Sequence, residues 1–293
     1  MNQKLFSFLV VILFASSTSF AQNSYQAEIE NWKQKRIDYL RSEDGWLNLV
    51  GLFWLHQGKN TFGSGDDVEI KFPKNSITKN AGYFELNGTT VTLFVNDSTD
   101  VTINNKNIRK AIIFSDDSQN IFATYGSLKW NIIKREDKTG IRLRDLKSNL
   151  AKDFKGVDRF ATDSSWRIKA YLKRPHDNTG VFITNILGQT KAETTAGKLI
   201  FNFANKEYAL DALEEDDQLF ILFGDATSGK ETYPSGRFMY ADKPGADGIT
   251  ILDFNKAFNP PCAFTSFATC PLPPKQNILP FAITAGEKNY GHH

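Results

Sequence analysis

The chain has 293 residues, of which 41% are hydrophobic and 23% are charged, and its formal net charge is +2. This near balance of charge gives no reason to expect a nucleic acid or an anionic surface as a partner. Two cysteines are too few for a disulfide-built scaffold, so a hydrophobic core must supply most of the stability.

The first 21 residues have the pattern of a signal peptide. Lys4 gives a positive start, an apolar run follows from Leu5 to Phe14, and Ser19-Phe20-Ala21 has the form of a signal-peptidase site. The apolar run is too short to span a bilayer, and no later segment is long enough. We therefore expect cleavage after Ala21, and export of the protein, without a membrane span, to the periplasm or the extracellular space.

Residues 22–45 are expected to form one amphipathic helix. Apolar and long side chains recur at helical spacing with charges on the other face: Ile29, Trp32, Arg36 and Leu40. Gly45 can end the helix. Such a helix usually packs on its own domain, and we prefer this interpretation to a partner-binding helix.

Residues 46–150 change to short strands, which indicate a β-sandwich. VEIKFP at 68–73 alternates apolar and polar residues, as a half-buried strand does. Asn87-Gly88 lies between two such runs and predicts a hairpin. The spacing of about eight to twelve residues between turns is typical of an all-β sandwich or barrel.

Residues 151–293 are expected to form a second antiparallel β unit, so the fold class is mainly β. Residues 148–175 are irregular and are interpreted as a connection between the halves. Strands resume from Gly180, and QLFILFG at 218–224 is a nearly continuous apolar run that predicts a central strand.

Four segments together resemble the uncharacterised bacterial family DUF1684. They are GWLNLVGLFWLHQGKNTFGS, DLKSNLAKDFKGVDRF, LFGDATSGKETYPSGRFMYAD and LDFNKAFNPPCAFTSFATCPLPPKQNILPFAITAGEK. The likeness covers most of the chain after the signal peptide. It implies a shared fold and supplies no catalytic residues.

A weaker likeness lies in residues 46–135. GKNTFGSGDDVEIKFP, followed by NGTTVTL and VTINNKNI, is similar to the strand order of forkhead-associated (FHA) β-sandwiches, which bind phosphothreonine. Ser64 stands where that family usually has Arg, and no His occurs between His56 and His176. The resemblance therefore extends to the sandwich fold and not to the phosphopeptide site.

Common catalytic motifs are missing from the sequence. There is no G-x-S-x-G, no phosphate-binding P-loop, and no G-x-G-x-x-G, so no cofactor is expected. Cys262 and Cys270 are too far apart in sequence for a structural zinc knuckle, so no metal is expected. We rank a Cys262–Cys270 disulfide first, buried thiols second and a metal third.

The same stretch is rich in proline. Five prolines flank AFTSFATC, and they are Pro260, Pro261, Pro271, Pro273 and Pro274. Because proline fixes φ and lacks an N–H donor, the flanking segments cannot be central strands. We expect two stiff loops around a short hairpin, clamped by the disulfide.

Polar residues of the C-terminal region are the candidates for a site. Arg237, Asp253 and Glu287 are candidate catalytic residues, and the candidate binding residues are Arg237, Asn255, Asn259 and Lys288. One interpretation is a structural network in which Arg237 forks onto Asp253 or Glu287, with the asparagines bonding loop backbone. The other is a pocket in which Arg237 holds an anion and Asp253 or Glu287 acts as acid or base. We favour the network.

The sequence thus predicts an exported protein that binds a small ligand or belongs to the cell envelope. The alternative is a hydrolase that uses Arg237, Asp253 and Glu287. Neither the ligand nor the oligomeric state follows from the sequence.

Overall fold

The computed structural model describes residues 22, 24–116, 121–175 and 180–291. The predicted signal peptide, His176, His292 and His293 lie outside the described residues. The described chain forms two compact units. The C-terminal unit holds the described residues up to Asp38 with 155–264 and 269–291, and the sandwich unit holds 39–154 with 265–268. In the described part, no helix is both long and apolar enough to cross a membrane.

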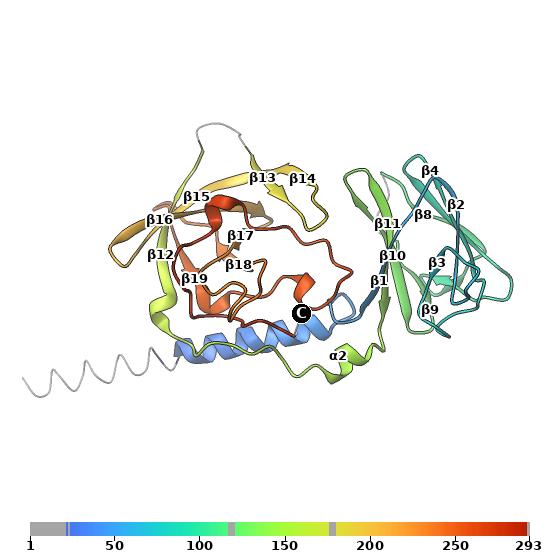
Figure 1. Cartoon of the computed structure of the whole chain (residues 1–293), viewed down its shortest axis with the longest axis horizontal. Helices are drawn as coiled ribbons and strands as arrows, with labels where there is room; N and C mark the ends of the chain where they lie inside the picture. The colour runs from blue at the N-terminus through green and yellow to red at the C-terminus, as the bar shows by residue number, and fades with distance from the viewer. Residues whose placement is uncertain (1–21, 23, 117–120, 176–179, 292–293) are drawn as a thin grey trace, which may run out of the picture. The chain divides into compact units, whose positions relative to one another are not determined.

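The predicted N-terminal helix is confirmed and is described over residues 24–41 (Figure 1). Its buried side chains include Tyr25, Ile29 and Leu40, at the spacing that predicted the helix. The helix ends before Gly45, whose N–H donates to the Ser42 carbonyl at 3.0 Å. A Cβ atom at Gly45 would lie 2.3 Å from the Leu40 carbonyl oxygen, so the chain can turn this closely only with glycine.

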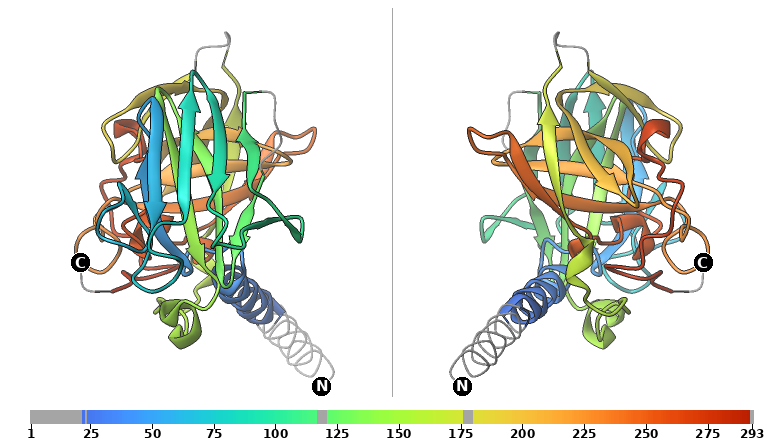
Figure 2. Two further views of the ribbon diagram at one scale, coloured as in Figure 1. Left: turned by 90° about the vertical axis from the view of Figure 1, so that its right-hand side faces the viewer. Right: turned by 90° about the vertical axis from the view of Figure 1, so that its left-hand side faces the viewer.

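The sandwich unit consists of two sheets that are antiparallel except for the parallel pair β2 and β3. The left view of Figure 2 shows this unit from the side of β2, β4, β5 and β8. The first sheet has the order β1-β11-β10-β9-β6-β7, with the strands β1 Leu49–Trp54, β6 Thr102–Ile103, β7 Lys106–Asn107, β9 Ala123–Tyr125, β10 Leu128–Arg135 and β11 Lys138–Asp145. The second has the order β3-β2-β4-β5-β8, with β2 Gly58–Gly63, β3 Ile70–Lys71, β4 Gly82–Asn87, β5 Thr90–Val95 and β8 Lys110–Phe114. A short helix, α2, follows at Asn149–Asp153.

Alternation along the strands builds the core of this unit. In β4 and β5 every second residue is buried. Phe62 and Phe84 of this sheet share one core with Trp130 and Ile141 of the other sheet. The predicted Asn87-Gly88 hairpin joins β4 to β5, with Asn87 opposite Thr90 and Gly88 at φ 61°. The predicted sandwich is therefore confirmed.

The C-terminal unit contains a six-stranded antiparallel sheet in the order β18-β17-β16-β15-β12-β19. Its strands are β12 Arg167–Lys173, β15 Thr195–Phe203, β16 Lys206–Glu215, β17 Gln218–Phe223, β18 Arg237–Asp242 and β19 Ile249–Asp253, and a separate hairpin is formed by β13 Val181–Thr184 and β14 Thr190–Glu193. Thr250 in β19 donates to the Asp242 carbonyl in β18 at 2.7 Å, so the two edge strands meet and the sheet curls round on itself. The core inside this sheet includes Leu199, Leu210, Ile221, Met239 and Leu252.

Two local predictions for this unit are wrong. Residues 167–173, interpreted as part of an irregular connection, form β12, which pairs with β15 on one side and β19 on the other. The segment AFTSFATC forms no strand hairpin, because a single 3₁₀ turn, η3 at Pro261–Ala263, leads into turns and extended chain. By contrast, β17 lies between β16 and β18, as its apolar run predicted.

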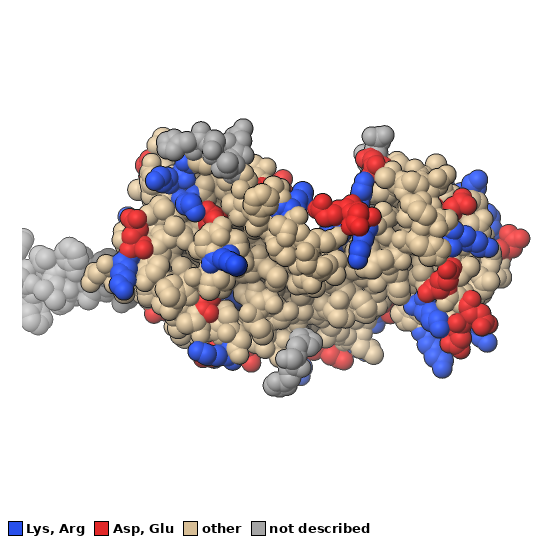
Figure 3. Space-filling view, turned by 45° about the horizontal axis from the view of Figure 1, so that its top comes forward, with Lys and Arg blue, Asp and Glu red and all other residues tan. Residues whose placement is uncertain are grey.

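After β19 the chain packs without further long strands. It forms the 3₁₀ turns η2 Phe254–Lys256 and η4 Lys275–Asn277 and single bridges such as Phe238 to Phe258 and Arg159 to Glu287. On the face in Figure 3, Lys and Arg side chains are interspersed with Asp and Glu side chains among the residues drawn in colour, in keeping with the small net charge.

Candidate functional site

Arg237 and Asp225 form a buried ion pair at the start of β18. Arg237 is 0% exposed, and its Nη2 donates to Asp225 Oδ2 at 2.8 Å. The other oxygen of Asp225 accepts bonds from the backbone N–H and the hydroxyl of Thr227, at 2.8 and 2.6 Å. The turn at 225–232 therefore supplies the counter-ion of Arg237, and it does so with every carboxylate oxygen engaged.

Three backbone carbonyls complete the surroundings of the Arg237 guanidinium. It donates to Ala285 at 2.5 Å, Ile283 at 3.1 Å and Glu287 at 3.3 Å. Burial lowers the pKa of Arg237, and the Asp225 carboxylate acts in the opposite direction. The predicted fork onto Asp253 or the Glu287 carboxylate is wrong, because the Asp225 carboxylate takes that place.

Glu287 holds a second buried cluster. Its side chain is 1% exposed, with Oε1 3.3 Å from Arg36 Nε and 3.8 Å from Arg159 Nη1. Its Oε2 accepts the Asn259 backbone N–H at 2.6 Å. Arg36 also donates to the Asn259 carbonyl at 2.9 Å, and the Asn259 side chain donates to the Lys288 carbonyl at 2.7 Å. This carboxylate therefore ties the helix to two segments of the C-terminal unit.

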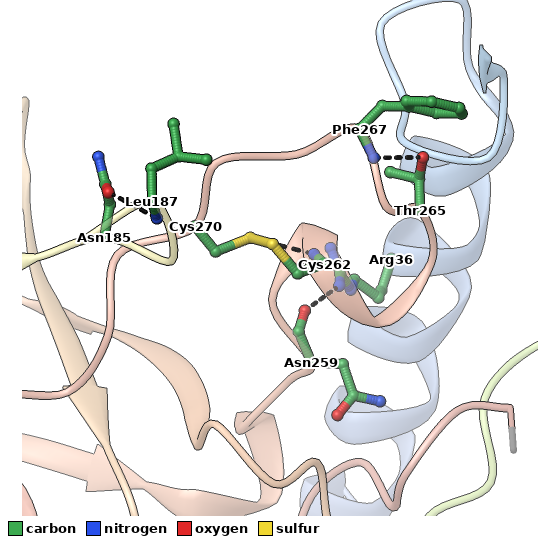
Figure 4. Close-up of a disulfide and its surroundings, with 8 residues drawn as sticks. All are labelled: Arg36, Asn185, Leu187, Asn259, Cys262, Thr265, Phe267 and Cys270. Atoms are coloured by element: carbon green, nitrogen blue, oxygen red, sulfur yellow. Dashed lines mark hydrogen bonds between the residues drawn. A yellow bond between two sulfur atoms is a disulfide. The ribbon is translucent and has the colours of Figure 1, made fainter. Parts of the chain in front are cut away.

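The disulfide lies beside this cluster (Figure 4). Cys262 and Cys270 are bonded, with their Cα atoms 6.2 Å apart, in the range of natural disulfides. Cys262 follows Asn259 closely in the sequence. Figure 4 shows the hydrogen bond that the Arg36 guanidinium donates to the Asn259 carbonyl. The predicted disulfide is thus present, although it closes a loop and not a strand hairpin.

Removing the disulfide should lower the free energy of unfolding by about 2–3 kcal/mol, the entropy expected for a loop of this length. The change is Cys262→Ser with Cys270→Ser, and the measurement is urea denaturation followed by fluorescence. Reductant should destabilise the natural protein to the same extent and leave the double variant unaffected. An equal effect of reductant on both proteins would contradict this prediction.

Asp253 belongs to a third set of bonds, at the end of β19. Its Oδ1 accepts the Tyr25 hydroxyl at 2.8 Å and the Asn255 backbone N–H at 3.2 Å. The Asn255 side chain donates to the Tyr25 oxygen at 2.9 Å and to the Asp163 carbonyl at 2.8 Å. Burial and the bond to Asp253 raise the pKa of Tyr25 above its usual range, so Tyr25 stays a hydrogen-bond donor.

A hollow of about 560 Å³ opens next to Asp253. The strands β18 and β19, the first residues of β12 and β17, the helix, the η2 turn and adjoining loop residues supply its lining. The lining comprises Glu28, Trp32, Arg167, Gln218, Tyr240, Ala241, Asp242, Lys243, Ile249, Thr250, Ile251, Asp253, Lys256 and Phe258. The hollow thus lies where the curled sheet meets its own edge. Its lining combines aromatic rings with charged side chains of both signs.

The aromatic part of this lining is a row of half-buried rings. Phe258 stacks on Tyr240 with centroids 5.9 Å apart and planes at 18°, and it lies 6.4 Å from Trp32. Two guanidinium groups lie over these rings. That of Arg36 is 4.5 Å from the centre of the Phe258 ring, and that of Arg159 is 4.9 Å from the centre of the Trp32 ring. Because Glu287 fixes both arginines, these rings are held in place before any ligand arrives.

The predicted residues therefore lie in three places. Asp253 lines the hollow, whereas Arg237 and Glu287 lie in buried networks outside the lining. Asn255 and Asn259 bond loop backbone, as predicted, and the Lys288 ammonium lies 4.7 Å from the centre of the Phe160 ring.

Sequence reasoning missed several residues of these clusters, namely Tyr25, Trp32, Arg36, Arg159, Arg167 and Asp225. Trp32 and Arg36 had been placed on the packing face of the helix. The amphipathic pattern of the helix was the one sequence signal that could have identified site residues. The partners of the remaining residues are set by the tertiary fold.

The fold and site define a mainly β, disulfide-containing protein with buried ion pairs beside an aromatic-lined hollow. Residues 152–288 match the family described as "Protein of unknown function (DUF1684)". The resemblance that the sequence motifs indicated is thus confirmed over residues 152–288. No curated protein matches the chain.

Among solved structures, an NMR structure of an uncharacterized protein of Haloarcula marismortui is 31% identical. The match covers 48% of this chain and 80% of that one, with a TM-score of 0.41. The FHA domain of FhaA, solved in complex with the intracellular domain of Rv3910, is 16% identical, and the match covers 32% of this chain and 97% of that one, with a TM-score of 0.23. A second FHA structure, from a study of phosphothreonine-dependent interactions, is 18% identical, with coverage of 32% and 92% and the same TM-score.

Proposed function

We propose that this is an exported protein that binds a small ligand in the hollow between β18, β19 and the helix. The observation that carries the proposal is a hollow of about 560 Å³ whose lining combines half-buried rings with charged and polar side chains. Ligand sites of small molecules have this size. Export is supported by the predicted signal peptide and by the disulfide, since disulfides persist in oxidising compartments.

The hydrolase alternative has less support. A general acid or base must come within hydrogen-bond reach of its substrate. Arg237 and Glu287 are 0% and 1% exposed, and their charged groups are bonded to protein partners. Asp253 alone of the three lines the hollow, so the geometry favours a binding role.

A mass spectrum of the protein recovered from its native compartment tests the proposal. The denatured mass should correspond to cleavage after Ala21 with two hydrogens missing, and the native spectrum should retain a small molecule. Tyr240→Ala removes a ring from the hollow and should abolish retention. Tyr171→Ala is the matched control, since Tyr171 is 55% exposed and lies outside the lining.

The proposal would be contradicted by a bare chain that also shows no shift of its melting temperature with any member of a metabolite panel. Equal retention by the two tyrosine variants would place the ligand elsewhere and would equally contradict it.

A further inference from the structure

Most charged groups in the lining of the hollow already have protein partners. Lys256 Nζ lies 2.6 Å from Glu28 and 3.9 Å from Asp253. Asp242 accepts a bond from the Gln218 side chain at 3.2 Å. Their charge and hydrogen-bonding capacity are therefore largely satisfied before a ligand binds.

Lys243 is likewise paired, with Glu214 at 3.6 Å. Arg167 differs from these residues, because its guanidinium forms no ion pair with any residue that the structure describes. A guanidinium carries five N–H donors in a fixed planar fork, so it presents an unused anion-binding group to the hollow.

Other residues fix the position of Arg167. It is the first residue of β12 and lies directly opposite Asp253 in the sheet. Its guanidinium is 5.5 Å from the centre of the Tyr25 ring, and the Tyr25 hydroxyl is bonded to Asp253 at 2.8 Å. The Asp253 carboxylate thus holds the tyrosine that supports Arg167.

The charge of the lining limits the anion that Arg167 can take. Three carboxylates, those of Glu28, Asp242 and Asp253, line the same hollow. The ammonium groups of Lys243 and Lys256 and the Arg167 guanidinium balance these three charges, so the lining has no surplus positive charge for a second anionic group. A single carboxylate matches the fork of one guanidinium. The rings of Trp32 and Tyr240 offer apolar contact to a flat body attached to that carboxylate.

From these contacts we infer that the hollow selects a small carboxylate attached to a six-membered ring, and that Arg167 binds the carboxylate. The inference rests on the proposed function and deepens it. The ring can be aromatic or that of a sugar acid, since an aromatic ring has apolar faces and a sugar ring has an apolar C–H face.

Isothermal titration calorimetry on the mature protein tests the inference with two matched pairs of probes, benzoate with benzamide and glucuronate with glucose. In at least one pair the carboxylate should bind more than about tenfold tighter than the neutral partner, and the pair that responds identifies the ring. Arg167→Gln should reduce that preference about tenfold or more. Lys169→Gln is the matched control, because Lys169 is exposed on the same strand and lies outside the lining.

Each result that would contradict the inference has its own consequence for the proposed function. Equal affinity for carboxylate and neutral partner would overturn the inference and leave the proposed function in place. Equal effects of Arg167→Gln and Lys169→Gln would remove Arg167 from the site. No binding in either pair would also overturn the inference, and the native mass spectrum would then decide the proposed function independently.

Discussion

Replacing Arg237 with leucine should lower the free energy of unfolding by about 3–5 kcal/mol, the cost of breaking a buried ion pair from one side. The substitution leaves the Asp225 carboxylate, 1% exposed, without a counter-charge. It also leaves the carbonyls of Ile283 and Ala285 without their donor. Urea denaturation followed by circular dichroism measures the loss.

A control and a double variant separate this effect from a general effect of losing arginine. Arg109→Leu removes an arginine whose partner Asp97 is fully exposed, and it should cost less than about 1 kcal/mol. Combining Arg237→Leu with Asp225→Leu should be less destabilising than the sum of the single changes, because no unpaired buried charge remains. Additive losses would show that the two residues do not stabilise each other.

Local patterns predicted the architecture, because strand alternation and helical spacing are properties of neighbouring residues. The hairpin at Asn87-Gly88 and the buried run of β17 are set within a few residues, and both are observed. The strand β12 was missed although Ile168, Ala170 and Leu172 alternate with charged or polar residues. This alternation is a usable strand signal, but it directly follows a long irregular stretch and was assigned to that stretch.

The ion pairs could not be predicted in the same way. Arg36 and Glu287 are 251 positions apart, and nothing local to either residue selects the other. Asp225 is a residue type that is common in turns, and its sequence neighbours do not indicate an ion pair. Arg237 reaches it only because the chain turns back after residue 225 and enters β18. Sequence therefore indicated which charges were enclosed by apolar segments, whereas the fold decided the partner of each.

Whether an enclosed charge has a protein partner decides how the C-terminal charges are interpreted. A buried charge is tolerated when it is paired, so apolar surroundings alone do not mark a site. In this protein the enclosed charges position the rings of the hollow, and the exposed Arg167 at its edge has the unused donors. The structural network and the pocket are thus adjacent: Asp253 belongs to both, and Arg36 contacts the Phe258 ring of the lining.

Replacing Glu287 with glutamine should destabilise the protein by about 3 kcal/mol or more. The carboxylate is the counter-charge of Arg36 and Arg159, each 11% exposed, and burial already lowers the pKa of Arg159. The amide keeps the shape of the side chain and removes its charge, so the loss reports on electrostatics. Urea denaturation of the variant gives the magnitude.

Glu231→Gln is the control, since Glu231 is exposed, and its effect should stay within about 0.5 kcal/mol. Ligand binding separates the two interpretations of Glu287. If the residue is structural, the folded variant should bind a ligand of the hollow with an affinity within a few-fold of the natural protein, after correction for the unfolded fraction. An unchanged stability with a lost ligand would instead make Glu287 part of a binding site, because only a contact with the ligand itself would then require its charge.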